Sequence, residues 1–233
     1  MREGMRWTEC VRPYKIWYRL RIEGSQNSLC SLEYIMASSP ASTLASPACS
    51  GPSRHRMTVD EFHRMGEAGI LHPEDRTELI HGEVFDMSPI GRLHAALVAG
   101  LAAAFHESLG RSVVVWTQNP VRLGLRNEVQ PDLVVLAPRA DFYATALPEP
   151  ADVRLIVEVA DSSLDHDVTV KIPLYAEHGV PEVWIIEAVS RQTHRFRSPV
   201  GGTFSERDTV PPDKPLEFAQ FRGSLAAILP IAG

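Results

Sequence analysis

Cysteine is scarce in this chain, which has three, at Cys10, Cys30 and Cys49. The residues that follow therefore hold no disulfide and no cysteine-bound metal, and we expect a reducing, cytoplasmic setting. Long apolar runs are also missing. No run approaches the roughly 20 residues that a bilayer-spanning helix needs, so the sequence predicts no membrane span.

The chain has no excess of positive charge. It contains 233 residues, with 23 Lys and Arg against 29 Asp and Glu, for a formal net charge of -6. Proteins that coat polyphosphate are usually strongly basic, so that class is excluded and any nucleic-acid contact must be local. Residues 1–56 hold 8 basic and 4 acidic side chains, which leaves 15 and 25, a net charge of -10, for residues 57–233.

Composition divides the chain near residue 56. Residues 37–56 are mostly Ser, Pro, Ala and Thr, and such a segment cannot bury enough apolar surface to offset its ordering entropy. Residues 1–36 have five aromatic side chains but no sustained helical or strand period. We therefore predict a disordered or non-native N-terminal extension over 1–56 and one folded domain over 57–233.

Three helices are predicted from caps and periodicity. The first opens at a Thr58-x-x-Glu61 capping box. The second carries apolar residues at i, i+4 and i+8 spacing over 93–109 and is predicted to end at Gly110. The third falls within 165–178, where Pro173 requires a late start or a kink.

Short β-branched runs bounded by Pro, Gly or Asn predict strands. They lie at residues 78–80, 83–85, 113–116, 121–123, 133–136, 153–159, 183–186 and 193–196. The first two form a hairpin around a His-Gly turn. Within 153–159, Leu155 and Val157 share one face and Glu158 points to the other. The C-terminal part is predicted to be less regular, and the whole predicts one α/β domain with a mixed sheet flanked by helices.

Two carboxylates and a lysine form the most informative set of polar residues. Asp132 opens a strand, Glu158 interrupts an apolar strand, and Lys171 follows thirteen residues later. Magnesium takes oxygen ligands and usually holds one or two carboxylates plus water, which leaves positions open for a phosphate oxygen. A compact ammonium can orient an attacking water and offset charge on a phosphate. Lysine is also rare, since the others are Lys15 and Lys214.

Each of these residues also has a plain structural explanation. Lys171 stands four residues after Asp167, and such a helical pair contributes only about 0.2–0.5 kcal/mol. Asp132 can end a turn, and a second Pro-Asp dipeptide, at Asp213, sits in a proline-rich loop. Glu158 can be an edge carboxylate facing water, although a charge in so apolar a run needs a partner or marks a site.

Other chemistries lack their motifs. The nine histidines include no His-Glu-x-x-His pair, and no glycine-rich phosphate loop or Gly-x-Ser-x-Gly elbow is present. Ser162 is instead predicted to cap the helix that follows it. His94 and His166 are the best candidates for a supporting role, with a packed or surface histidine as the commoner explanation of His94.

Four stretches of the sequence carry a family resemblance. The first three are Glu78-Leu79-Ile80-His81-Gly82-Glu83 with Met87-Ser88-Pro89, then His94, and then Gln130-Pro131-Asp132-Leu133-Val134-Val135. The fourth and longest begins with Val157-Glu158-Val159-Ala160-Asp161-Ser162-Ser163 and Asp167. It continues with Lys171-Ile172-Pro173-Leu174-Tyr175-Ala176 and Gly179-Val180-Pro181-Glu182-Val183-Trp184-Ile185-Ile186. In these stretches, over roughly residues 57–190, the chain resembles the Uma family of restriction endonucleases, within the PD-(D/E)XK nuclease superfamily.

The resemblance implies a restriction-endonuclease-like core and assigns roles to individual residues. It implies that Asp132 and Glu158 bind magnesium, with manganese as an alternative, and that the backbone carbonyl of Val159 assists. Glu78 matches the additional acidic residue of the family and could hold a second ion or a water bound to the metal.

One position departs from the superfamily pattern. The pattern has lysine two places after the second carboxylate, where this chain has Ala160. Lys171 must then reach the site from the following helix. Tyr175, one turn further on, would share its face and line the site, or else be a packed aromatic.

Two functions stay open on the sequence alone. The first is a magnesium-dependent endonuclease that hydrolyses DNA, whose predicted catalytic residues are Asp132, Glu158, Lys171 and Glu78. The second is a nuclease-shaped domain that no longer cuts and serves as an interaction or oligomerisation module, which the net charge of -10 favours. DNA is the expected partner, and RNA and a homo-oligomer are left open. Arg122, Arg126 and Arg139 could form a local basic track and could equally be solvated charges of strands and loops.

Overall fold

The computed structural model describes residues 53–72, 74–161 and 163–229, all within one compact unit, Pro52–Gly233. The extension predicted over 1–56 falls almost wholly outside these ranges, and so does the helix cap predicted at Ser162. No helix in the described ranges has the length and apolar character needed to cross a bilayer.

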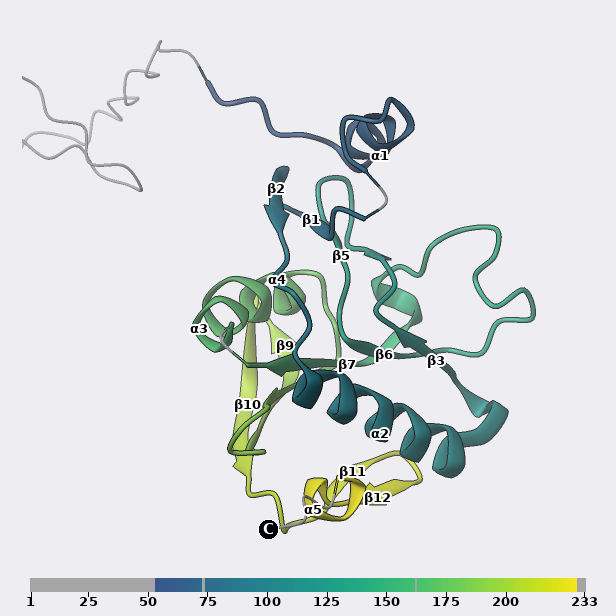
Figure 1. Cartoon of the computed structure of the whole chain (residues 1–233), viewed down its shortest axis with the longest axis vertical. Helices are drawn as coiled ribbons and strands as arrows, with labels where there is room; N and C mark the ends of the chain where they lie inside the picture. Colours follow the sequence, from purple (N-terminus) through teal and green to yellow (C-terminus); the bar gives the residue numbers. More distant parts are fainter. Residues whose placement is uncertain (1–52, 73, 162, 230–233) are drawn as a thin grey trace, which may run out of the picture. The chain divides into compact units, whose positions relative to one another are not determined.

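A six-stranded mixed sheet forms the centre of this unit (Figure 1). The strand order is β10-β9-β8-β7-β6-β3. The strands are β3 (Val114–Thr117), β6 (Leu133–Leu136), β7 (Val153–Ala160), β8 (Glu182–Glu187), β9 (Thr193–Val200) and β10 (Thr203–Val210). Only β7 and β8 are parallel neighbours in this sheet. Because parallel neighbours need a crossover, the chain between them forms a helical segment. The predicted α/β fold with a mixed sheet flanked by helices is confirmed.

A smaller sheet, ordered β2-β1-β5-β4, carries the predicted hairpin. Its strands are β1 (Thr77–Ile80), β2 (Glu83–Asp86), β4 (Val121–Arg122) and β5 (Glu128–Val129). The turn residues His81 and Gly82 have positive φ angles of 51° and 74°, as a two-residue primed turn requires. A Cβ at Gly82 would also lie 2.8 Å from the backbone of Met57. Both the positive φ and this close approach therefore favour glycine at this position.

Two helices confirm the caps predicted for them. In α1 (Val59–Glu67), the backbone N–H of Glu61 donates to Thr58 and the backbone N–H of Thr58 donates to the Glu61 carboxylate. The long helix α2 (Arg92–Leu109) ends at Gly110 with a positive φ. Short 3-10 turns follow at η1 (Gly110–Ser112) and η2 (Pro150–Asp152).

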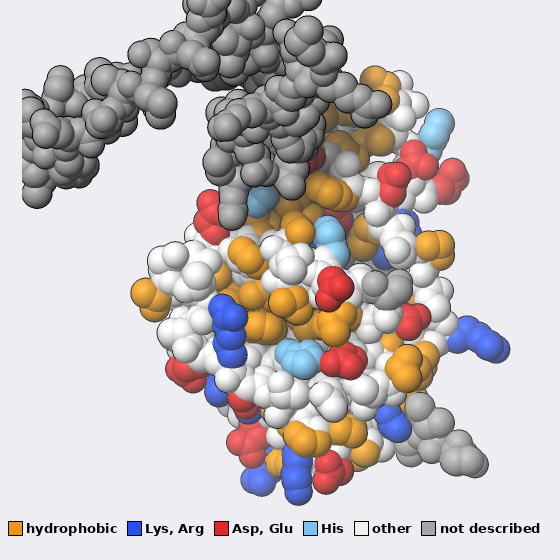
Figure 2. All heavy atoms as spheres, turned by 90° about the vertical axis from the view of Figure 1, so that its left-hand side faces the viewer, with side chains coloured by type: hydrophobic (Ala, Val, Ile, Leu, Met, Phe, Trp, Pro, Cys, Tyr) orange, Lys and Arg blue, Asp and Glu red, His pale blue; other side chains and the backbone are white. Residues whose placement is uncertain are grey.

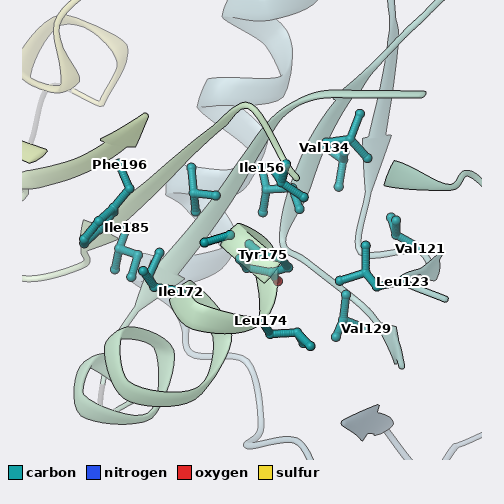
Figure 3. Packing of buried hydrophobic residues seen from close by; sticks show 14 of the residues in the cluster. Val121, Leu123, Val129, Val134, Ile156, Ile172, Leu174, Tyr175, Ile185 and Phe196 are labelled. Carbon is teal, nitrogen blue, oxygen red and sulfur yellow. The ribbon is translucent and has the colours of Figure 1, made fainter. Parts of the chain in front are cut away.

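The central sheet separates two hydrophobic cores. On one face, Leu155 and Val157 pack with α2, β11 (Leu216–Phe218), β12 (Phe221–Gly223) and α5 (Leu225–Ile228). On the other face, Ile156 packs with α4 (Ile172–Glu177) and with residues of the smaller sheet; Figure 3 shows Tyr175 in the middle of this cluster. Since side chains alternate along a strand, Glu158 shares the second face, as the sequence predicted.

The crossover between β7 and β8 is a composite helix. It runs through α3 (Leu164–His166), a π-helical turn η3 (Asp167–Lys171) and α4. The late start is therefore wrong, because the helix begins at Leu164. The regular α-helix is instead interrupted by a widened turn just before Pro173.

The C-terminal part is more regular than predicted. β10 is eight residues long, and β11 pairs with β12. The strand signal is weak because only Phe204 and Val210 of β10 are buried. This edge strand forms because it pairs with β9, and its own apolar pattern is too weak to predict it.

Candidate active site

The two predicted metal-binding carboxylates meet at one end of adjacent strands. Asp132 immediately precedes β6, Glu158 lies near the end of β7, and Leu133 is registered opposite Val157. The Asp132 backbone N–H donates to Glu158 Oε2 at 3.4 Å, and the Val159 N–H donates to Asp132 Oδ2 at 2.9 Å. Both carboxylates are buried, and strand pairing fixes their separation.

Lys171 reaches these carboxylates from the crossover helix. Its ammonium donates to Glu158 Oε1 at 3.2 Å and to Glu78 Oε1 at 3.1 Å. Lys171 is only 5% exposed. Its ion-pair partners among the described residues come from β1 and β7, so the local helical pair with Asp167 does not explain this lysine.

The π turn accounts for the inward direction of Lys171. An α-helix turns 100° per residue, so positions four apart drift by about 40° around the axis. A π turn is wider and drifts the opposite way, which keeps Asp167, Lys171 and Tyr175 on one buried side. The Ile172 N–H closes this turn by donating to the Asp167 carbonyl.

Tyr175 is both a packed aromatic and a polar partner in the site. Its ring is fully buried, and its hydroxyl donates to Glu158 Oε1 at 2.5 Å. Burial, together with the nearby charge of Glu158, raises the pKa of the Tyr175 phenol well above its usual value. The phenol therefore keeps its proton as a donor to Glu158 at neutral pH.

Three polar side chains that the sequence left uncertain or unnoticed surround Asp132 and Asp167. His94 of α2 hydrogen-bonds Asp132 Oδ1 through Nε2 at 2.7 Å, and Gln118 Nε2 donates to the same oxygen at 3.4 Å. Ser163 Oγ donates to Asp167 Oδ2 at 2.7 Å. Gln118 has a φ of 50°, an unusual backbone value that the sequence does not signal.

Burial dominates the protonation of the central groups. It raises the pKa of Glu158 to about 8, against the attraction of Lys171 and with the repulsion of Asp132, Asp167 and Glu78. For Lys171, burial favours the neutral amine, but the charges of Glu158 and Glu78 outweigh it and raise the pKa above its usual value. Lys171 is therefore a permanent cation, and Glu158 gives up its proton readily only when further positive charge is nearby.

These residues line a pocket of about 380 Å³. Glu78, Asp132, Glu158, Val159 and Lys171 all contribute to its wall. All five predicted site residues are thus brought together. Other parts of the wall come from the β2–α2 connection, from the first turn of α2 and from the start of the crossover helix, including Met87, Ser88, Pro89, His94 and His166.

The predicted basic track is not assembled at this pocket. Arg122 pairs with Asp60 at 3.5 Å, Arg139 pairs with Asp141 at 2.6 Å, and neither they nor Arg126 lines the pocket. Arg139 follows the end of β6 opposite to Asp132. The basic-track interpretation is therefore wrong for this pocket. Arg139 is close to Asp132 in the sequence, but the whole of β6 separates the two residues in the structure.

The donor set fits a hard divalent cation. Strand residues turn their N–H and C=O to the same side, so the Val159 carbonyl faces the Asp132 end together with the N–H that binds Asp132. Among the described residues, no three His, Cys, Asp or Glu side chains form a ready-made metal cage. Two carboxylates with one backbone carbonyl and open positions for water match magnesium better than zinc.

The comparisons with known proteins agree with this fold. A family model named Uma2, described as "Putative restriction endonuclease", matches residues 59–228. The chain also resembles the crystal structure of "a putative nuclease belonging to DUF820" from Anabaena variabilis, with a TM-score of 0.58 and 17% sequence identity over 74% of this chain and 97% of that one. At this identity the likeness shows the fold alone. No curated protein matches the chain. Because the family model covers well over half of the sequence, the chain belongs to the Uma2 family of restriction-endonuclease-like proteins.

Proposed function

We propose that this pocket hydrolyses phosphodiester bonds in DNA with the help of a divalent cation, magnesium or alternatively manganese. One observation carries the proposal. Asp132, Glu158 and Lys171 converge from two strand ends and a helix on one pocket, where hydrogen bonds hold Asp132 and an ion pair joins Lys171 to Glu158. The same set of oxygen donors and a fixed ammonium suits the hydrolysis of a phosphate ester.

Asp132, Glu158 and the Val159 carbonyl would hold the cation. Four buried carboxylates line this pocket against one buried ammonium; they belong to Glu78, Asp132, Glu158 and Asp167. This surplus of negative charge favours binding of a hard cation. When bound, magnesium supplies positive charge that polarises a phosphate oxygen and lowers the pKa of water.

Lys171 would act on the water and on the phosphate as a fixed cation. Two of its three N–H donors are taken by Glu78 and Glu158, and the third has no acceptor among the described residues. That donor is available to orient an attacking water or to stabilise charge that grows on the phosphate. Tyr175 and Glu78 keep the ammonium and the Glu158 carboxylate in place. The further role of Glu78 in holding a second ion stays a prediction.

The test is DNA cleavage by the purified full-length chain. Supercoiled and linear DNA are incubated with magnesium, manganese or EDTA, beside Asp132→Ala. Asp213→Ala is the matched control, because it changes the same residue type after a proline in an exposed loop. We expect metal-dependent cutting by the parent and by Asp213→Ala, and none by Asp132→Ala. Equal cutting by all three proteins would show that Asp132 is not part of a nuclease site.

The rival function is a module that binds a partner without cutting. The net charge of -10 in residues 57–233 favours it, and on the face drawn in Figure 2 acidic and basic side chains are interspersed. Such a surface offers little sequence-independent attraction for phosphate. A noncatalytic module would leave DNA intact with every metal. It would also bind magnesium no better than a chain with alanine at Asp132 and Glu158, as measured by titration calorimetry.

A further inference from the structure

The pocket wall contains far more negative than positive charge. Two cationic side chains line it, Arg76 and Lys171. The acidic side chains that line it are Glu78, Asp86, Asp132, Glu158, Asp161 and Asp167. A phosphodiester entering this space meets repulsion from every carboxylate that a bound cation does not neutralise. A cationic side chain that can still contact the substrate is therefore important for offsetting this repulsion.

The two cations are engaged very differently. Lys171 is buried between Glu78 and Glu158. Arg76 is half-buried on the wall, and no carboxylate pairs with it among the described residues. One of its N–H groups, at Nη1, donates to the Ser88 carbonyl at 3.2 Å. A guanidinium has five N–H donors, so most of its hydrogen-bonding capacity is left over.

Arg76 lines the same pocket as Asp132, Glu158 and Lys171. It stands two residues before Glu78 in extended chain, where the Met87 N–H donates to its carbonyl at 2.7 Å. Residues two apart in such chain point to the same side and are separated by about 6.6 Å along it. Arg76, directly before β1, and Glu78, within it, are thus placed on the same side of the chain, and both line the pocket.

We propose that Arg76 binds a phosphate of the DNA backbone and positions the substrate against the Asp132, Glu158 and Lys171 site. A planar guanidinium matches two phosphate oxygens at once, which a lysine cannot do. This inference rests on the nuclease function proposed above. A purely structural explanation is that Arg76 only holds the β2–α2 connection through Ser88.

The experiment measures binding of a fluorescein-labelled 20-base-pair DNA by anisotropy, with the full-length chain in calcium at several salt concentrations. The variants are Arg76→Gln and Arg76→Lys. Arg111→Gln is the control, because Arg111 is exposed and lies beyond the far end of α2, about 27 Å from its start. Cleavage of the same DNA is then followed in magnesium.

We expect Arg76→Gln to weaken DNA binding about tenfold or more, as for loss of a charge-assisted hydrogen bond. The slope of log affinity against log salt should fall by about 0.9, the value for one lost phosphate contact. Arg76→Lys should keep the slope of the parent and lose part of the affinity. In cleavage, Arg76→Gln should raise KM much more than it lowers kcat, since the contact is made before the chemical step.

Two results would overturn the proposal in different ways. If the parent binds and cuts DNA but Arg76→Gln keeps the salt slope of the parent, or changes it no more than Arg111→Gln does, Arg76 is structural and the nuclease function stands. A parent that neither binds nor cuts overturns the nuclease function and this inference together.

Discussion

Replacing Lys171 with methionine removes the buried cation that separates two buried carboxylates. Its Nζ lies 3.1 Å from Glu78 Oε1 and 3.2 Å from Glu158 Oε1. These oxygens are therefore no more than about 6 Å apart, and two ionised carboxylates at that distance repel each other by about 3 kcal/mol at an effective dielectric of 20. Methionine fills a similar volume, so the packing is largely kept. Glu158, whose pKa is raised to about 8, holds its proton most of the time at pH 7 and so avoids most of this repulsion. We still expect the free energy of unfolding to fall by about 2–3 kcal/mol, because the buried Glu78 and Glu158 lose the ammonium that donates to both of them.

Urea unfolding followed by circular dichroism, at pH 7 in EDTA, measures this loss. Lys214→Met is the matched control, since Lys214 is exposed and its one ion-pair partner in the part of the chain that the structure describes is Asp213, at 3.6 Å; its effect should stay within about 0.5 kcal/mol. Added magnesium should recover part of the loss in Lys171→Met, because the cation offsets charge on the same carboxylates. If Lys171→Met unfolds at the same urea concentration as Lys214→Met, the electrostatic reasoning about this site is wrong.

Three further changes probe separate parts of the molecule. Tyr175→Phe removes the hydroxyl that binds Glu158, and it should lower kcat about tenfold and the free energy of unfolding by about 1–2 kcal/mol in parallel cleavage and urea assays. Phe105→Ala empties a fully buried position against the Phe221 ring, and it should cost about 3–5 kcal/mol of unfolding free energy in the same urea assay. Asp132→Asn should abolish the heat of magnesium binding in titration calorimetry while the protein stays folded. An unchanged binding isotherm would show that Asp132 is not a ligand of the metal.

The predictable part of the site rests on strand patterns. Alternation along 153–159 placed Glu158 on the face opposite Leu155 and Val157, and the structure confirms this. A charge in so apolar a run also signalled partners, and Glu158 has Lys171 and Tyr175. Strand periodicity is local, so it is visible in one sequence.

The remaining part depends on tertiary contacts. The pairing of Lys171 with two strands requires a π turn, and helical spacing alone suggested a local partner instead. His94 sits on an apolar helix, and only the docking of α2 against the sheet brings its ring to Asp132. Arg76 precedes a strand and carries no sequence motif beyond its spacing from Glu78. Its exposure to the pocket depends on the β2–α2 connection packed beside it.

The most direct test of the proposed active site is plasmid nicking by the full-length parent, Lys171→Met and Lys214→Met, each in magnesium and in EDTA. The parent and Lys214→Met are expected to nick supercoiled DNA in magnesium only, and folded Lys171→Met is expected to leave it intact. Nicking by Lys171→Met at the rate of the parent would contradict the assignment of this buried pocket as the active site.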